Sequence, residues 1–117
     1  MSERDLRLYC ADILDSGSAI LEFVKGLSFE EFCNDRKTYS AVIREFEIIG
    51  EAAGNLPDEL KRGRPDVEWR DIKDFRNLLI HEYFAVDLEI VWKIIQDDLP
   101  ILMDAVREMM RAESESH

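Results

Sequence analysis

Apolar residues recur every three or four positions along most of this chain, which is the spacing of an amphipathic α-helix. We therefore predict four main helices and one short extra helix, over about 2–25, 28–35, 36–53, 69–84 and from 87 onward. The last of them repeats its apolar residues at alternating intervals of four and three, and this heptad pattern predicts a seam inside a helical bundle. The seam consists of Leu88, Trp92, Ile95, Leu99, Leu102, Val106 and Met109.

Glycine and proline interrupt these helices at defined positions. Gly17 predicts a kink or a close approach of a neighbouring helix, and Gly50 predicts such an approach, because glycine carries no Cβ atom. Pro100 predicts a kink, because proline removes one hydrogen bond and crowds the preceding turn. Ser28 and Asp87 stand where an N-cap side chain would begin a helix.

The pattern as a whole predicts an all-α fold, an antiparallel bundle of four main helices plus a short extra helix. A chain of 117 residues has the size of one domain. We place that domain at residues 1–112, followed by a disordered polar tail at 113–117. The longest stretch without helical periodicity is predicted at 58–68.

Composition and charge limit the functions that this chain can have. A formal net charge of −11 favours solubility and argues against a strong general affinity for nucleic acid. There is no apolar run of membrane-spanning length, and the charged N-terminus lacks the apolar core of a signal peptide. We therefore expect a cytoplasmic protein without a membrane partner, in which Cys10 and Cys33 stay free thiols.

The stretch RNLLIHEY, residues 76–83, contains the only histidine inside the chain, His81. At roughly 100° per residue, His81 lies about 140° around the helix from Arg76. A regular helix therefore cannot direct both side chains at one atom, so either the helix frays near His81 or a second chain completes the site. The basic and polar face of this helix holds Arg70, Lys73, Asn77 and His81.

Two interpretations of Arg76 and His81 stay open at this point. In the first, both residues are structural, and a carboxylate such as Glu47 or Glu51 pairs with the arginine. In the second, they handle phosphate, because arginine offers a planar fork of donors and histidine moves protons near neutral pH. The basic cluster KRGRP, residues 61–65, has two readings as well: a solvated loop, or a patch that guides a phosphate backbone.

The spacing of Arg76, His81 and Tyr83 resembles the signature of the HEPN superfamily, in its HepT-like toxin branch. Further segments that look like this family follow one another along the chain and cover most of it. They are EIIGEAAGNLP (47–57), WRDI (69–72), RNLLIHEYFAVD (76–87) and VWKIIQDDLPIL (91–102). The resemblance implies a homodimeric helical bundle whose two copies of the motif come together.

The resemblance also implies a function, namely the toxin of a toxin–antitoxin pair that acts as a metal-independent endoribonuclease. Arg76 would stabilise charge on the phosphate and His81 would act as general base or acid. Asn77 would orient one of these groups. Arg70 and Lys73 are candidate RNA contacts. We expect no cofactor, no metal ligand set and no DNA partner.

Tyr83 has a separate candidate role. In families that this chain resembles, a nucleotidyltransferase antitoxin adds AMP to the tyrosine of the motif, and the added negative charge would compete with RNA. The other reading of Tyr83 is a packed aromatic residue whose hydroxyl is hydrogen-bonded. An alternative function for the whole protein is a non-catalytic subunit that binds a nucleotide or substrate and partners a nucleotidyltransferase, which the acidic charge favours.

Overall fold

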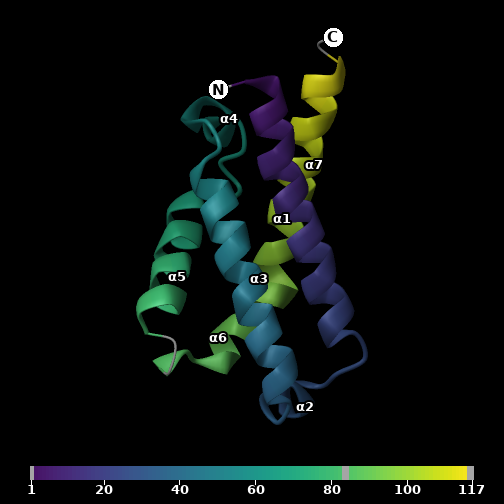
Figure 1. The fold of residues 1–117 in the computed structure, drawn as a ribbon, viewed down its shortest axis with the longest axis vertical. Helices are drawn as coiled ribbons and strands as arrows, with labels where there is room; N and C mark the ends of the chain where they lie inside the picture. The colour runs from purple at the N-terminus through teal and green to yellow at the C-terminus, as the bar shows by residue number, and fades with distance from the viewer. Residues whose placement is uncertain (1, 83–84, 116–117) are drawn as a thin grey trace.

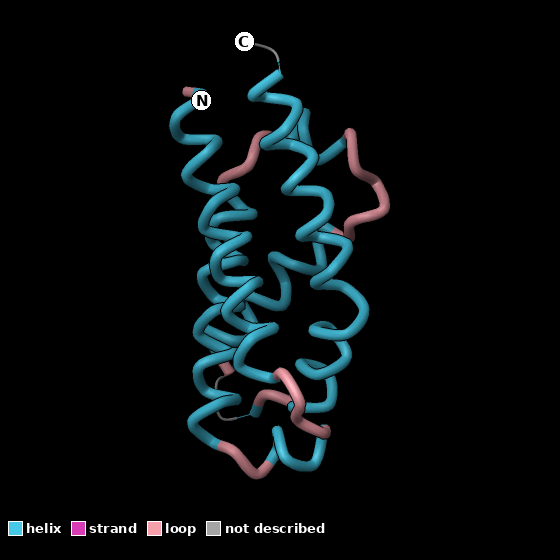
Figure 2. The backbone as a smooth tube through the Cα atoms, turned by 90° about the vertical axis from the view of Figure 1, so that its right-hand side faces the viewer, coloured by secondary structure: helices cyan, strands magenta, loops and turns pink. Residues whose placement is uncertain are grey.

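A computed structural model describes residues 2–82 and 85–115 of the chain. Four long helical segments run alongside one another and form an elongated bundle of 47 × 28 × 23 Å (Figures 1 and 2). The main segments are α1 (Glu3–Val24), α3 (Arg36–Gly54), α5 (Trp69–His81) and a last arm made of α6 (Leu88–Lys93), η2 (Ile94–Asp98) and α7 (Leu99–Glu115). Within the described residues there is no β-strand, so the predicted all-α bundle is confirmed.

Two short helices complete the described part of the bundle, where the sequence predicted one. α2 (Phe29–Cys33) was expected, but α4 (Asp58–Arg62) lies in the stretch 58–68 that was predicted to be irregular. Acidic residues in the first turn of α4 and basic residues in its last turn complement the helix dipole, which supports this single turn despite its weak periodicity.

Two of the helices, α5 and α7, end at other residues than the sequence predicted. The motif helix α5 ends at His81 rather than near residue 84, because Glu82 leaves helical geometry while its amide still donates to the Leu78 carbonyl. Residues 83 and 84 lie outside the described residues. α7 continues to Glu115, so residues 113–115 are helical where a polar tail was expected.

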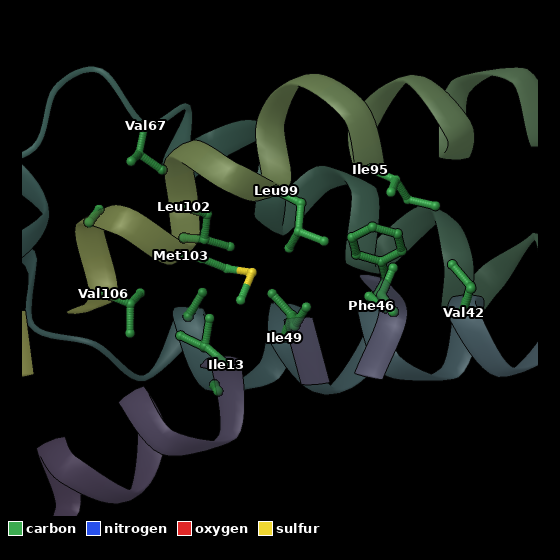
Figure 3. Packing of buried hydrophobic residues seen from close by; sticks show 14 of the residues in the cluster. Ile13, Val42, Phe46, Ile49, Val67, Ile95, Leu99, Leu102, Met103 and Val106 are labelled. Atoms are coloured by element: carbon green, nitrogen blue, oxygen red, sulfur yellow. The ribbon is translucent and has the colours of Figure 1, made fainter. Parts of the chain in front are cut away.

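The core lies between α1, α3 and α7, whose apolar side chains point toward one another (Figure 3). The heptad seam of the last arm is confirmed inside the bundle, because its members are buried or half-buried against the other helices. The buried members are Ile95, Leu99, Leu102, Val106 and Met109. No helix in the described ranges is long and apolar enough to cross a bilayer.

Close approaches of helices occur at both glycines that interrupt the periodic pattern. A Cβ atom on Gly17 would lie 2.7 Å from Sδ of Met103, which brings α1 against α7. A Cβ atom on Gly50 would lie 2.4 Å from Cβ and 2.6 Å from Cγ of Arg76, which brings α3 against α5. The predicted close approaches are therefore confirmed, and the second one places the motif arginine.

A π-helical turn lies shortly before Pro100, at which the sequence predicted a kink. η2 ends at Asp98, two residues before the proline, and the arm continues into α7. Proline has no amide hydrogen to donate to the preceding turn, and a wider turn accommodates the missing bond. The cap at Asp87 is confirmed, because its carboxylate accepts from the Glu89 amide at 2.9 Å.

Candidate functional site

Helix α5 is held against the rest of the bundle by its apolar side. Phe75 packs edge-on against Phe46 of α3, with ring centroids 5.4 Å apart, and Leu79 is fully buried. At the start of the helix, the indole nitrogen of Trp69 donates to the carbonyl oxygens of Lys61 and Arg64, each at 3.1 Å. These contacts leave the opposite face of α5 open to solvent.

Arg76 lies where α5 crosses α3. Its Nη2 donates to Oε2 of Glu51 at 2.5 Å, and its Nη1 donates to Oδ1 of Asn77 at 3.4 Å. The side chains of Arg76 and Glu51 are 33% and 61% exposed, so this ion pair is open to solvent. Of the two carboxylates that the sequence offered to Arg76, Glu51 is the one that binds it, while Glu47 pairs with Arg44.

A surface depression of about 540 Å³ opens beside Arg76, between α3, α4 and α5. We call it the cationic hollow. Six charged residues line it: four cations and the two carboxylates of Glu51 and Asp58. The hollow therefore has a surplus of two positive charges in a chain whose net charge is −11. The cations are Lys61, Arg70, Lys73 and Arg76.

His81 lies away from this hollow, at the last residue of α5, and is exposed. It is still part of the helix, so its side chain leaves the axis about 140° from that of Arg76. Fraying therefore does not turn His81 toward Arg76. Within one chain, the structure therefore does not bring Arg76 and His81 to a common point.

Comparison with known proteins shows which family shares these features. The family model described as "Ribonuclease HepT-like" matches residues 13–109, which include all of α3 and α5. The chain belongs to the HepT-like ribonuclease family. The predicted membership of this family is thereby confirmed, and the predicted enzyme class, ribonuclease, is the one for which the family is named.

Relatives of this HepT-like chain are similar over most of their length. It is 43% identical to a "Probable ribonuclease HepT" of Thermococcus cleftensis over 86% of this chain and 91% of the relative. It is 41% identical to a "Putative RNase TTE0752" of Caldanaerobacter subterraneus over 92% of this chain and 96% of the relative. A "Putative RNase MJ1380" of Methanocaldococcus jannaschii is 40% identical over 86% and 92%. No solved structure matches the chain significantly.

The structure thus brings together some of the predicted site residues of this HepT-like protein and separates others. Arg70, Lys73 and Arg76 line one hollow, and Asn77 contacts Arg76. His81 stands apart from them, and Tyr83 lies outside the described residues. In residues 2–82 and 85–115, no three histidine, cysteine, aspartate or glutamate side chains are grouped so that they could hold a metal ion.

The cations of the basic cluster at 61–65 have different roles: Arg64 makes structural ion pairs, and Lys61 lines the cationic hollow. Arg64 binds Asp66 and Glu108 at 2.8 and 2.6 Å and reaches Asp104 at 3.4 Å, so it fastens the α4–α5 connection to α7. The hydrogen bond to Asp66 is the largest cause of the raised pKa of Arg64. Lys61, in contrast, lines the cationic hollow.

Sequence reasoning missed the two carboxylates inside the hollow, and it offered Lys61 only as a member of the basic cluster at 61–65. Glu51 was a candidate partner of Arg76 but not a member of the site, and Asp58 was assigned to an irregular stretch. The signal that could have found Glu51 is its position next to Gly50, since a close helix approach also brings the neighbouring side chain to the crossing point.

Cys10 and Cys33 are free thiols, as predicted, and burial raises the pKa of Cys10 to about 11.

Proposed function

We propose that this HepT-like protein is an endoribonuclease toxin that cuts RNA at a site shared by two copies of the chain. The observation that carries the proposal is the placement of Arg76 and His81 on one helix of a HepT-like ribonuclease, pointing about 140° apart. A two-fold dimer would bring Arg76 of one chain to His81 of the other, which a single α5 helix does not achieve.

The chemistry of RNA cleavage suits these two side chains. The 2′-hydroxyl group attacks the adjacent phosphorus, and negative charge grows on the phosphate oxygens. The Arg76 guanidinium, already in a charged hydrogen bond at the rim of the cationic hollow, would stabilise that charge. His81 would take the proton of the 2′-hydroxyl or give one to the leaving oxygen, a task that needs no metal ion.

The surroundings of Arg76 support a substrate with phosphate groups. Arg70 and Lys73 are exposed on the same hollow and would contact neighbouring phosphates of the RNA backbone. Asn77 accepts a hydrogen bond from Arg76 at 3.4 Å and would keep the guanidinium oriented. The strongly negative remainder of the chain would confine RNA to this region rather than let it bind elsewhere.

Two single variants and their mixture test the proposal. Arg76→Ala and His81→Ala should each lower RNA cleavage by a factor of about 10²–10⁴, while the protein stays folded and dimeric. If each site uses Arg76 of one chain and His81 of the other, mixing the two dead variants restores one good site in each mixed dimer. Random exchange of subunits would then return about one quarter of the wild-type activity.

The outcomes of this test are distinct. No recovery in the mixture, with mixed dimers shown to form, contradicts a shared site. A monomer in light scattering at micromolar concentration contradicts it too. A His81→Ala protein that melts like wild type and cuts RNA at full rate contradicts the nuclease proposal itself. His81 is the cleaner of the two positions, because it is exposed whereas Arg76 supports the α3–α5 crossing.

We also propose that a nucleotidyltransferase antitoxin neutralises the toxin by adding AMP to Tyr83, in the cytoplasm. Tyr83 follows His81, the exposed last residue of α5, by two positions in the sequence. The phosphate of the adduct would place negative charge near the site and compete with RNA. Mass spectrometry of the protein after incubation with the antitoxin and ATP would find the added AMP on the peptide that contains Tyr83.

A second candidate function is a non-catalytic subunit that binds a nucleotide or substrate for a nucleotidyltransferase. Two observations favour it: the net charge of −11, and the neutralisation of Arg76 by Glu51. The cleavage assay separates the two functions. Purified protein that binds nucleotides or RNA but leaves RNA intact, at any concentration that supports the dimer, would favour the binding subunit.

A further inference from the structure

We propose that Glu51 is a positioning residue whose carboxylate occupies, in the RNA-free protein, the place on the Arg76 guanidinium that a phosphate group of RNA takes. The inference rests on the proposed function, since it concerns the substrate of the same site. Glu51 acts through Arg76, by holding it at the rim of the cationic hollow and by giving way to the phosphate.

The geometry of the α3–α5 crossing brings the two groups together. Gly50 lets the backbone of α3 approach Arg76 so closely that no Cβ atom would fit between them. Glu51 is the next residue, and its Oε2 accepts from Nη2 of Arg76 at 2.5 Å. The pair is therefore a consequence of how the helices cross, and it keeps the arginine at the rim of the hollow.

A carboxylate and a phosphate compete for the same donors. The guanidinium group presents a planar fork of N–H groups that matches both anions, so Glu51 and an RNA phosphate cannot both use the Nη2 edge. Exchange is easy here, because an ion pair with a 61% exposed carboxylate contributes little to stability. A phosphate that enters also gains the field of Arg70 and Lys73, which line the same hollow.

The charge balance of the hollow depends on Glu51. With Glu51 in place there are four cations and two carboxylates. Without the Glu51 charge, Asp58 alone opposes the four cations, and Arg76 is no longer neutralised. Removing this carboxylate should therefore tighten the binding of phosphate-containing ligands, whereas loss of a residue with a purely structural role would weaken it or leave it unchanged.

Glu47 provides a matched control on the same helix. It lies one turn before Glu51, pairs with Arg44 at 3.1 Å, and is not among the residues that line the cationic hollow. Glu47→Gln and Glu51→Gln remove the same charge from α3 and keep the side chain nearly the same size. Any general effect of a less acidic protein on RNA binding will appear in both variants.

The experiment measures binding of a 2′-O-methyl RNA oligonucleotide, which the protein cannot cut because the attacking hydroxyl is blocked. Glu51→Gln should bind it about two- to fivefold more tightly than Glu47→Gln, the range that the loss of an exposed ion pair allows. In the Arg76→Ala background most of this difference should disappear, because only the effect of the Glu51 charge on the other cations of the hollow remains. Equal affinities of the two glutamine variants, or a difference that is just as large without Arg76, overturn the proposal.

Pyrophosphate as a second probe separates this inference from the proposed function. Suppose that the protein cuts no RNA, yet Glu51→Gln binds pyrophosphate more tightly and this gain requires Arg76. The exchange at Arg76 then stands, and the nuclease proposal fails. If wild type cuts RNA but Glu51→Gln tightens neither probe relative to Glu47→Gln, the exchange is wrong and the nuclease proposal survives.

Discussion

The close approach at Gly50 leads to a sharp prediction about stability. A Cβ atom at this position would lie 2.4 Å from Cβ and 2.6 Å from Cγ of Arg76. Carbon atoms in contact lie about 3.5–4.0 Å apart, so α3 and α5 would have to separate by roughly 1 Å or more. Cβ of Arg76 is fixed to the backbone and cannot rotate away, so the strain falls on the helix crossing itself.

The magnitude follows from two opposing effects of Gly50→Ala. Overpacking of this kind costs about 1–3 kcal/mol, and the contacts here place it in the upper half of that range. Alanine in place of glycine returns about 1 kcal/mol through its higher helix propensity. The free energy of unfolding should therefore fall by about 1–2 kcal/mol, which lowers Tm by about 4–8 °C in a domain of this size.

Gly17→Ala is the matched control, because Gly17 is also a buried glycine inside a helix. The atoms that its Cβ would meet belong to the Met103 side chain, at 2.7–3.1 Å, and a methionine can adjust through several rotatable bonds. We expect Gly17→Ala to stay within about 1 kcal/mol of wild type, since the propensity gain offsets the adjustment.

Thermal unfolding followed by circular dichroism, with urea titration as a second measure, compares the two variants. Combining Gly50→Ala with Arg76→Ala should not restore stability, because the alanine keeps the Cβ atom that clashes. The reasoning is refuted if Gly50→Ala is as stable as Gly17→Ala. It is also refuted if Arg76→Ala rescues Gly50→Ala completely, which would show that the longer part of the arginine, not the helix crossing, carries the strain.

Three further predictions follow from the proposed chemistry and from the charges of the fold. RNA cleavage should persist in excess EDTA and leave a 2′,3′-cyclic phosphate or its opened product, and activity that stops with EDTA and returns with magnesium would contradict it. Tyr83→Phe should keep the fold and the nuclease activity but block modification by the antitoxin, so a modified Tyr83→Phe protein would place the AMP elsewhere. Asp98→Asn should raise Tm slightly at pH 7, because partial desolvation of this largely exposed carboxylate and then the charge of Asp97 raise the pKa of Asp98. A carboxylate whose pKa is raised in the folded state destabilises the protein as the pH rises through that pKa. The gain in Tm should therefore disappear below about pH 3, where the aspartate is protonated in the folded and the unfolded state. An equal gain in Tm at pH 7 and below pH 3 would contradict this cause.

The periodic pattern of apolar residues by itself determined the class of fold and most of the helices. An α-helix buries one side, so its apolar residues recur at intervals of three and four along the sequence. The seam from Ile95 to Met109 and the caps at Ser28 and Asp87 belong to this local information, and the structure has all of them. The family was also readable from the sequence, because the spacing of the motif residues and the four segments that follow one another along the chain resemble it together.

Only the tertiary structure decided how the motif is surrounded. Glu47 and Glu51 lie one turn apart on the same helix and both were candidate partners of Arg76, and the crossing at Gly50 selects the second. Arg64 pairs with residues up to 44 positions away, whereas Lys61 lines the cationic hollow, and this difference between the two cations depends on tertiary contacts. Such choices arise from the packing of helices against one another, which no local interval encodes.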